Sequence, residues 1–176
     1  MNLALLVLRV VVGGLFVGHG AQKLFGWFGG HGPEGTGAFF ESIGIERGRT
    51  LAIVAGGSEL VGGLLFACGL ATPVGAALLS AVMIAAVWTV HRGNGLWVTQ
   101  GGFEYNLVLL AVLFAVTAAG PGAWSLDGQW DLHLAGEGWA LAELGAGVLG
   151  AALARGLQLL SARRSPRANR PTPVSG

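Results

Sequence analysis

The sequence predicts an all-α membrane protein, a polytopic helix bundle with four core transmembrane helices and a fifth helix toward the C-terminus. Three observations carry this prediction. Hydrophobic residues make up 53% and charged residues 11% of the 176 residues, whereas soluble domains carry roughly 25% charge. The mean hydropathy is +0.65. Apolar runs of about 20 residues, the length that crosses the hydrocarbon core of a bilayer, recur along the chain.

Five apolar segments are predicted to cross the membrane, and in chain order they are residues 3–25, 51–70, 73–90, 102–119 and 139–160. Thr72-Pro73 predicts a tight turn with proline near the first position of the third helix. The fifth segment is the weakest because Glu143 and Arg155 interrupt it.

The 32 glycines are spread through these apolar runs without a collagen period, which favours helices that pack closely in lipid. Gly14 and Gly18 in the first span form a small-xxx-small pair, as do Ala146 and Gly150 in the last. We therefore expect close helix contacts in the bundle.

The chain divides into three predicted parts. Residues 1–127 form the four-helix membrane bundle, residues 128–160 an extra transmembrane helix, and residues 161–176 a disordered basic tail. The tail carries several arginines and prolines, so we expect it near anionic headgroups rather than on nucleic acid. The first segment lacks the basic stretch that precedes the apolar core of a signal peptide, which favours a retained helix.

The distribution of basic residues predicts the orientation in the membrane. With five spans, Arg47, Arg49, Arg92 and the basic tail lie on one side, and the opposite loops, residues 71–72 and 121–138, contain no Lys or Arg. With four spans the tail changes sides and this bias disappears. We therefore expect the N-terminus outside and the C-terminus in the cytoplasm. Arg9 does not fit the pattern and is expected to snorkel or to pair.

Polar side chains inside the predicted spans gather in one half of the bundle. His19, Gln22 and Lys23 follow one another at helical spacing, so they share one face of the first span. At a rise of about 1.5 Å per residue, His19 lies about 9 Å, Lys23 about 3 Å and Glu59 about 12 Å inside the same membrane face. We expect Lys23 and His19 to face Glu59.

Further candidates come from the third and fourth spans, whose connecting loop lies on that same side. Glu104 opens the fourth span and Asn106 follows it, and His91, a weaker candidate, closes the third. We expect Glu104 to face Lys23 as well, and Gln22 and Asn106 to satisfy the remaining donors and acceptors. The predicted intramembrane cluster consists of His19, Gln22, Lys23, Glu59, Glu104 and Asn106.

Each charge in this cluster also has a purely structural interpretation. Glu59 forms either a single interhelical salt bridge that fixes the packing or part of a small-molecule, quinone or proton site. Lys23 either joins the cluster or snorkels to the interface. Glu104 either joins it or complements the dipole at a helix N-terminus. The sequence leaves these alternatives open and identifies no catalytic residue.

The remaining histidines and the cysteine limit the chemistry. His19 and His91 lie on one predicted side, yet a lone intramembrane histidine is more often hydrogen-bonded within the bundle than bound to haem. His31 and His133 lie in loops without a second ligand at metal spacing, so no metal site is predicted. Cys68 is the only cysteine, so thiol chemistry needs a partner.

The sequence resembles the DoxX family of small bacterial integral membrane proteins over about residues 2–127. The resemblance rests on HGAQKLFGWFGG ending the first span, SELVGGLLFACGLATPVGA through the second and its turn, GFEYNLVLL opening the fourth and GPGAWSLD closing it. His19, Lys23, Glu59 and Glu104 match recurring family positions. The segment after Asp127 departs from the family pattern.

This resemblance implies a bundle of four membrane helices, a place in the bacterial inner membrane and a redox setting. Relatives include the small subunit of an archaeal thiosulfate:quinone oxidoreductase and a mycobacterial membrane protein that associates with a superoxide dismutase and a sulfurtransferase. The expected partners are the lipid bilayer, redox enzymes and further copies of the chain, and the expected cofactor, if there is one, is a quinone.

Three functional hypotheses follow. The first is an accessory or anchoring subunit of a membrane redox complex in thiol, sulfur or oxidative-stress metabolism. The second is the quinone-binding subunit of an enzyme of the thiosulfate:quinone oxidoreductase type, with electrons supplied by a partner because the chain has no flavin or nicotinamide fingerprint. The third, a small-solute or proton carrier, has less support because no inverted repeat is visible.

Overall fold

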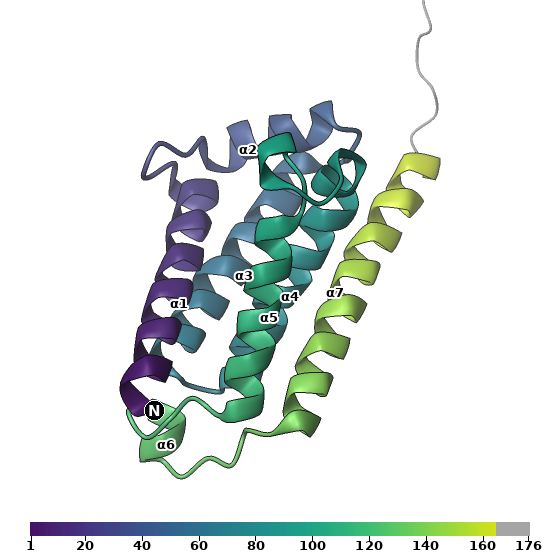
Figure 1. Cartoon of the computed structure of the whole chain (residues 1–176). Coiled ribbons are helices and arrows are strands. Elements are labelled where there is room, and N and C mark those ends of the chain that lie inside the picture. Colours follow the sequence, from purple (N-terminus) through teal and green to yellow (C-terminus); the bar gives the residue numbers. More distant parts are fainter. Residues whose placement is uncertain (165–176) are drawn as a thin grey trace, which may run out of the picture.

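The computed structural model describes residues 1–164, and all regular secondary structure within them is helical. Five helices run side by side along the bundle, namely α1 (Asn2–Phe25), α3 (Gly48–Cys68), α4 (Thr72–Ala86), α5 (Glu104–Ala119) and α7 (Glu137–Arg164). Figure 1 shows the N-terminus at the lower end of the bundle and the end of α7 at the upper end. The predicted all-α membrane bundle is confirmed.

Four helices are long and apolar enough to cross a membrane, and these are Asn2–Phe25, Gly48–Cys68, Thr72–Asn94 and Glu137–Leu159. The third of them includes a π-helical turn, η1 (Val87–His91), and a 3₁₀ turn, η2 (Arg92–Asn94). The predicted fourth span, α5, has 16 residues and is therefore about 24 Å long at the usual rise. The predicted fifth segment is a full-length helix, α7.

The chain alternates direction through the bundle, so its connections fall at two end faces. The upper end in Figure 1 holds α2 (Gly32–Ser42), the η turns with η3 (Val98–Gln100), and the end of α7. The lower end holds the N-terminus and α6 (Leu126–Gln129). The loops that carry Arg47, Arg49 and Arg92 thus share the upper end. The helix α7 continues past residue 160 to Arg164, and residues 165–176, the rest of the predicted basic tail, lie outside the described residues.

The short helices α2 and α6 were not predicted from the sequence. Helix α2 lies in the segment expected to be a loop, and it begins with a proline at its first turn and Glu34 beside it, both of which favour a helix N-terminus. The turn before α4 agrees with the prediction, since Pro73 occupies the first turn of α4. Ala71, just before it, adopts φ 44, a left-handed conformation that sharpens the turn.

Helices α1 and α3 pack backbone against backbone. A Cβ added at Gly13 would lie 2.6 Å from the Gly63 carbonyl oxygen, and one added at Gly20 would lie 2.7 Å from the Gly56 carbonyl oxygen. Real side chains do not fit this close to backbone atoms, so glycine is required at positions 13 and 20. This contact fixes α1 beside α3 over most of its length.

The predicted small-residue pairs lie on helices that do pack closely, but only some of the predicted residues make the close contacts. A Cβ added at Gly14 or Gly18 would meet nothing within 4 Å, and the glycines one position before Gly14 and two after Gly18 make the contact instead. On α7, Ala146 is exposed, whereas Gly147 and Gly150 lie against α4. The spacing of small residues did not specify which face of each helix is buried.

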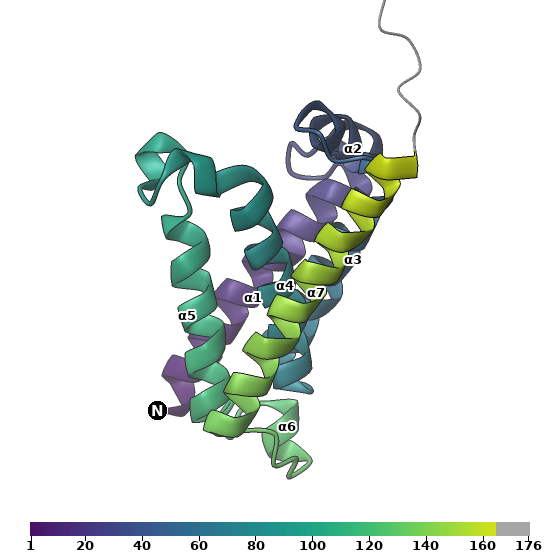
Figure 2. The same ribbon diagram turned by 90° about the vertical axis from the view of Figure 1, so that its right-hand side faces the viewer.

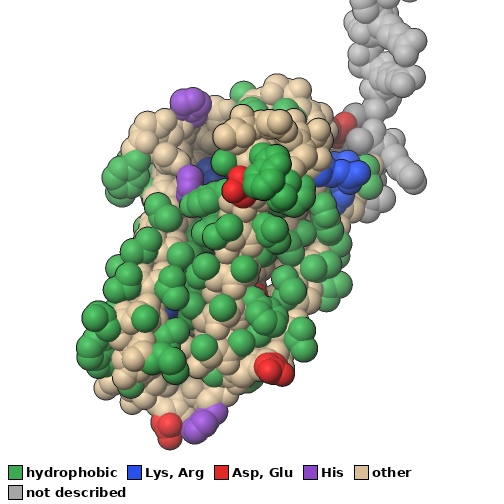
Figure 3. Space-filling view, in the orientation of Figure 1, with side chains coloured by type: hydrophobic (Ala, Val, Ile, Leu, Met, Phe, Trp, Pro, Cys, Tyr) green, Lys and Arg blue, Asp and Glu red, His purple; other side chains and the backbone are tan. Residues whose placement is uncertain are grey.

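The core lies between these helices and is aliphatic and aromatic. Its fully buried members are Phe16, Phe66, Leu79, Leu113 and Val116. Apolar side chains also cover the outside, as on α1, where Val7, Val10 and Val11 are each more than half exposed. Figure 3 shows apolar groups over the middle of one face and most charged and histidine side chains toward the two ends. This distribution is typical of a lipid-facing surface.

Candidate functional site

An ion pair between α1 and α3 lies in the upper half of the bundle. Lys23, in the last turn of α1, donates from Nζ to both Glu59 carboxylate oxygens, at 2.9 and 2.6 Å. The Lys23 side chain is 21% exposed and that of Glu59 only 3%. A Cβ added at Gly56, one turn before Glu59, would lie 2.9 Å from the Lys23 Cβ. Glycine at this position lets the lysine stem cross α3 and reach the carboxylate.

The other two members of the predicted cluster on α1, His19 and Gln22, bond to each other and to the turn after the helix. The Nδ1 atom of His19 lies 3.1 Å from Oε1 of Gln22, and Nε2 of Gln22 donates to the Phe28 carbonyl oxygen at 3.2 Å. Gln22 therefore anchors the turn that follows α1 and holds the His19 ring. Gln22 was expected to complete the hydrogen bonding of the buried charges. In the structure its amide bonds His19 and the Phe28 carbonyl oxygen instead.

The two candidates from the fourth span, Glu104 and Asn106, differ in their surroundings. Glu104 accepts a hydrogen bond from the Val98 backbone N–H at 3.0 Å, so it fixes the loop before α5 and does not face Lys23. The expected contact of Glu104 with the lysine is wrong, because this loop folds back over the start of α5. Asn106 is buried and its Nδ2 lies 3.4 Å from the Met83 sulfur.

His91 ends the π-helical turn η1. Its Nδ1 lies 2.8 Å from the Gly101 carbonyl oxygen. A carbonyl oxygen only accepts hydrogen bonds, so Nδ1 carries the proton and Nε2 of the neutral ring remains an acceptor. A π turn widens a helix by one residue per turn, and such turns occur frequently at functional sites. Here the widened turn directs Thr89, Val90 and His91 toward a cleft.

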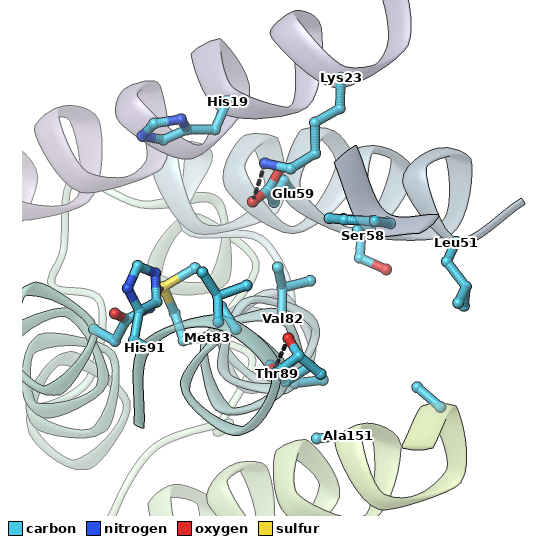
Figure 4. A pocket seen from close by; sticks show the side chains of 18 of the residues that line it. His19, Lys23, Leu51, Ser58, Glu59, Val82, Met83, Thr89, His91 and Ala151 are labelled. Atoms are coloured by element: carbon cyan, nitrogen blue, oxygen red, sulfur yellow. Dashed lines mark hydrogen bonds and ion pairs between the residues drawn. The ribbon is translucent and has the colours of Figure 1, made fainter. Parts of the chain in front are cut away.

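The cleft has a volume of about 730 Å³ and is lined by residues of α1, α3, α4, α5 and α7 and of the segments at the upper end. Of the predicted cluster, His19, Lys23, Glu59, Asn106 and the weaker candidate His91 line it, whereas Gln22 and Glu104 do not. Figure 4 shows His19, Lys23 and Glu59 on one wall, with Val82, Met83 and His91 facing them and Ala151 of α7 below. In Figure 2, α5 and the η turns stand apart from α1 and α2 at this end.

Most of the wall is apolar. Leu51, Val54, Leu78, Val82 and Ala154 are among its members. The volume falls in the range of about 300–1,000 Å³ that small-molecule sites occupy, and such sites combine apolar walls with a few directed polar groups. The arrangement can hold a flat, largely apolar molecule with polar atoms at one end.

A second buried polar cluster, which sequence reasoning missed, lies at the lower end. The Arg9 side chain is fully buried and donates to the Ala67 carbonyl oxygen at 3.1 Å and the Trp124 carbonyl oxygen at 2.6 Å. Asp127 accepts from the backbone N–H groups of Ala71 and Thr72, at 2.7 and 2.9 Å, and from the Thr72 hydroxyl at 2.7 Å. Arg9 therefore binds carbonyl groups inside the bundle and does not snorkel to the headgroups.

In this lower cluster, Asp127 joins α6 to the turn before α4, and Arg9 joins α1 to the end of α3 and to the segment before α6. The signal for it was present in the sequence, because Asp127 ends the GPGAWSLD stretch and Thr72 lies in the predicted tight turn. Their pairing depends on the tertiary arrangement, which no local pattern encodes. Its role is to close the lower end of the bundle.

The loop histidines lie away from the cleft. His133 lies 3.7 Å from Asp131, and both side chains are almost fully exposed. Within residues 1–164, no group of three or more His, Cys, Asp and Glu side chains is arranged to hold a metal ion.

Comparisons with known proteins agree with this architecture. The model of the DoxX family matches residues 4–92. A Bacillus subtilis (strain 168) protein named "Putative oxidoreductase CatD" is 35% identical over 114 residues, which cover 65% of this chain and 78% of that protein. No solved structure matches the chain.

Two further relatives are named without an activity. An uncharacterized membrane protein of Mycobacterium tuberculosis is 30% identical over 135 residues, covering 70% of this chain and 79% of the relative. An uncharacterized protein of Haemophilus influenzae is 32% identical over 130 residues, covering 70% of this chain and 87% of the relative.

Proposed function

Because the chain belongs to the DoxX family of membrane proteins, we propose that it is a membrane subunit of a redox complex and that its cleft binds a quinone. The observation that carries this proposal is the apolar cleft of about 730 Å³ with Lys23, Glu59, His19, His91 and Asn106 in its wall. The name of the Bacillus subtilis relative, an oxidoreductase, supports the same class of function.

The polar groups suit the two carbonyl oxygens of a quinone ring. A lysine ammonium has three N–H donors, and Lys23 uses two of them on Glu59. Among the described residues no partner takes the third, which is therefore free to bind a ligand oxygen. The Asn106 amide, whose bond to the Met83 sulfur is weak, supplies a second donor deeper in the cleft.

The size and apolar lining suit the remainder of such a molecule. The wall formed by Leu51, Val54, Val82 and Ala154 provides an apolar surface for the ring and the first part of an isoprenoid tail. The electrons come from a partner protein in this proposal, because a single cysteine cannot complete a dithiol cycle.

A second candidate function is a non-catalytic accessory or anchoring subunit of the same kind of complex. The observation that favours it is that Lys23 and Glu59 satisfy each other, as expected of a bridge that only fixes α1 against α3. In that case the protein holds a redox enzyme at the membrane, and the cleft carries lipid.

Quinone binding can be measured directly on the purified protein. We would titrate a short-tailed quinone and follow the quenching of tryptophan fluorescence, since quinones quench excited indoles and Trp88 belongs to the η1 turn beside the cleft. Ala154→Phe places a ring in the cleft wall, and Ala146→Phe is the matched control because Ala146 lies on the same helix with its side chain exposed.

The expected result is at least a tenfold rise in Kd for Ala154→Phe, which corresponds to about 1.4 kcal/mol, and no change for Ala146→Phe. Equal quinone affinity in both variants would rule out the cleft as the site. Absence of quinone binding, together with a redox enzyme that co-purifies in mild detergent, would favour the anchoring role.

The placement of the chain belongs to the same proposal. We place residues 1–127 as the family bundle, residues 128–160 as an added spanning segment packed on α4 and α5, and the protein in the bacterial inner membrane with its C-terminus in the cytoplasm. A reporter that is active only in the periplasm, fused after Gly176, should be silent. An active reporter would reverse the orientation.

A further inference from the structure

Glu143 on α7 is a buried carboxyl group that has no cationic partner in the part of the chain that the structure describes. Its side chain is only 3% exposed. One oxygen, Oε2, accepts a hydrogen bond from the Ser80 hydroxyl at 3.1 Å. The other oxygen, Oε1, is buried and has no hydrogen-bond partner among the described residues, and the same is true of the Thr117 hydroxyl on α5.

Within residues 1–164 no ion pair with this carboxyl group is formed. The helices packed against α7 are α4 and α5, and neither carries Lys or Arg. The other titratable groups on α7, on α5 and in the turns directly after α4 are Glu137, Arg155, Arg163, Arg164, Glu104, Tyr105, His91 and Arg92. Of these, Arg155 lies about 18 Å further along α7 and bonds Gln158.

The contrast with Glu59 indicates the state of the group. Glu59 is equally buried but receives two hydrogen bonds from Lys23. An ionised carboxylate in hydrocarbon without such a partner is so unfavourable that the group takes up a proton instead. A bound metal cation is a poorer explanation, because hard cations need several oxygen ligands. Among the described residues, the only group hydrogen-bonded to the Glu143 side chain is the Ser80 hydroxyl.

The position of Glu143 relates it to the cleft. Gly147, one turn further along α7, packs on Ser80, where a Cβ would lie 2.7 Å from the serine Cβ. The next turn of α7 supplies Gly150 and Ala151 to the cleft wall. Glu143 therefore lies about 10 Å below those residues and about 9 Å from the start of α7 at the lower end.

We propose that Glu143 is a proton-binding site, held by Ser80 between the lower end of the bundle and the floor of the cleft. The carboxyl group carries its proton at rest. In the proposed function it donates this proton, by way of water in the cleft, to an oxygen of a quinone that has taken up electrons from the partner protein, and it takes a replacement proton from water at the α6 end. Only this use of the proton rests on the proposed function, whereas the proton-binding site is independent of it.

A hydrophobic carbodiimide tests the site in the wild-type protein. The reagent adds a protonated carboxyl group across one C=N bond: the acid proton moves to nitrogen and the carboxylate oxygen bonds to carbon. In membranes at neutral pH we expect peptide mass spectrometry to locate the adduct on Glu143. Exposed Glu137, six positions earlier on the same helix, is the internal control and should remain unmodified.

Infrared spectroscopy provides the second measurement. The carbonyl stretch of a protonated carboxyl group should be present in the wild type and lost in Glu143→Gln, and it should be unaffected by Glu137→Gln. Full retention of this band in Glu143→Gln, or an adduct that forms on Glu137 as fast as on Glu143, would overturn the proposal. Neither measurement uses quinone. If the protein fails to bind quinone, the two measurements still decide whether Glu143 carries a proton.

Discussion

Breaking the Lys23–Glu59 pair is expected to destabilise the protein far more than removing both charges together. The Lys23 Nζ lies 2.6 Å from one Glu59 oxygen, and the carboxylate side chain is 3% exposed against 21% for the lysine. Removal of one partner from a buried pair costs about 3–5 kcal/mol, because the remaining charge is left without compensation. Lys23→Met should lie at the upper end of this range, since the remaining carboxyl group is only 3% exposed and must stay unpaired or take up a proton.

The two single variants should therefore differ. Glu59→Gln leaves an ammonium group that is partly exposed and can turn toward the interface, so its cost should lie near the lower end. The Lys23→Met, Glu59→Gln double variant carries no charge at these two positions and should recover most of the loss. For a chain of 150–250 residues, each kcal/mol shifts Tm by about 2–4 °C, so the single variants should lower Tm by about 6–20 °C.

The assay is thermal unfolding of the three variants in one detergent, followed by circular dichroism. The coupling free energy is the difference between the double variant and the sum of the single variants. If the double variant is destabilised by the full sum of the two single variants, the coupling free energy is zero and the Lys23–Glu59 ion pair does not stabilise the bundle.

Three further predictions follow from contacts at other positions. Gly20→Val should cost about 1–3 kcal/mol by overpacking because a Cβ there meets the backbone of α3, whereas Gly18→Val, which has open space around it, should change Tm little. Asp127→Asn should weaken the turn before α4 and accelerate hydrogen exchange of the two backbone amides that donate to the carboxylate. Unchanged exchange would show that Asp127 does not stabilise this turn. The hydrogen bond from Arg49 lowers the pKa of Glu34, so NMR titration should show this pKa rising in Arg49→Gln. The small stabilisation that the hydrogen bond gives is present above the pKa that Glu34 has in the unfolded chain. It is lost as pH falls through the lower pKa of the folded protein.

The sequence predicted those parts of the site that follow from helical spacing and depth. Lys23 and Glu59 were expected in the same half of the membrane because both positions can be counted from helix ends at a fixed rise. The structure brings them into contact. Glu104 was misplaced because its direction depends on how residues 95–103 fold back, and that loop has no periodic pattern.

The lower cluster could not be predicted for a different reason. Arg9 and Trp124 are 115 positions apart, and their contact depends on how the first helix lies against the segment after α5. Composition predicts that a buried arginine needs partners, yet it does not say that these are backbone carbonyl groups. Tertiary packing decides such pairings.

The glycine contacts also determine which parts of the protein can move. Backbone pressed against backbone has no rotamers to change, so α1 and α3 behave as one stiff body, extended to α4 by the close approach of Gly62 and Gly75. Helix α5 contains no glycine and meets its neighbours through side chains. We therefore expect the α1–α3 wall of the cleft to be the more rigid one, and a bulkier ligand to displace α5 outward rather than α1 or α3.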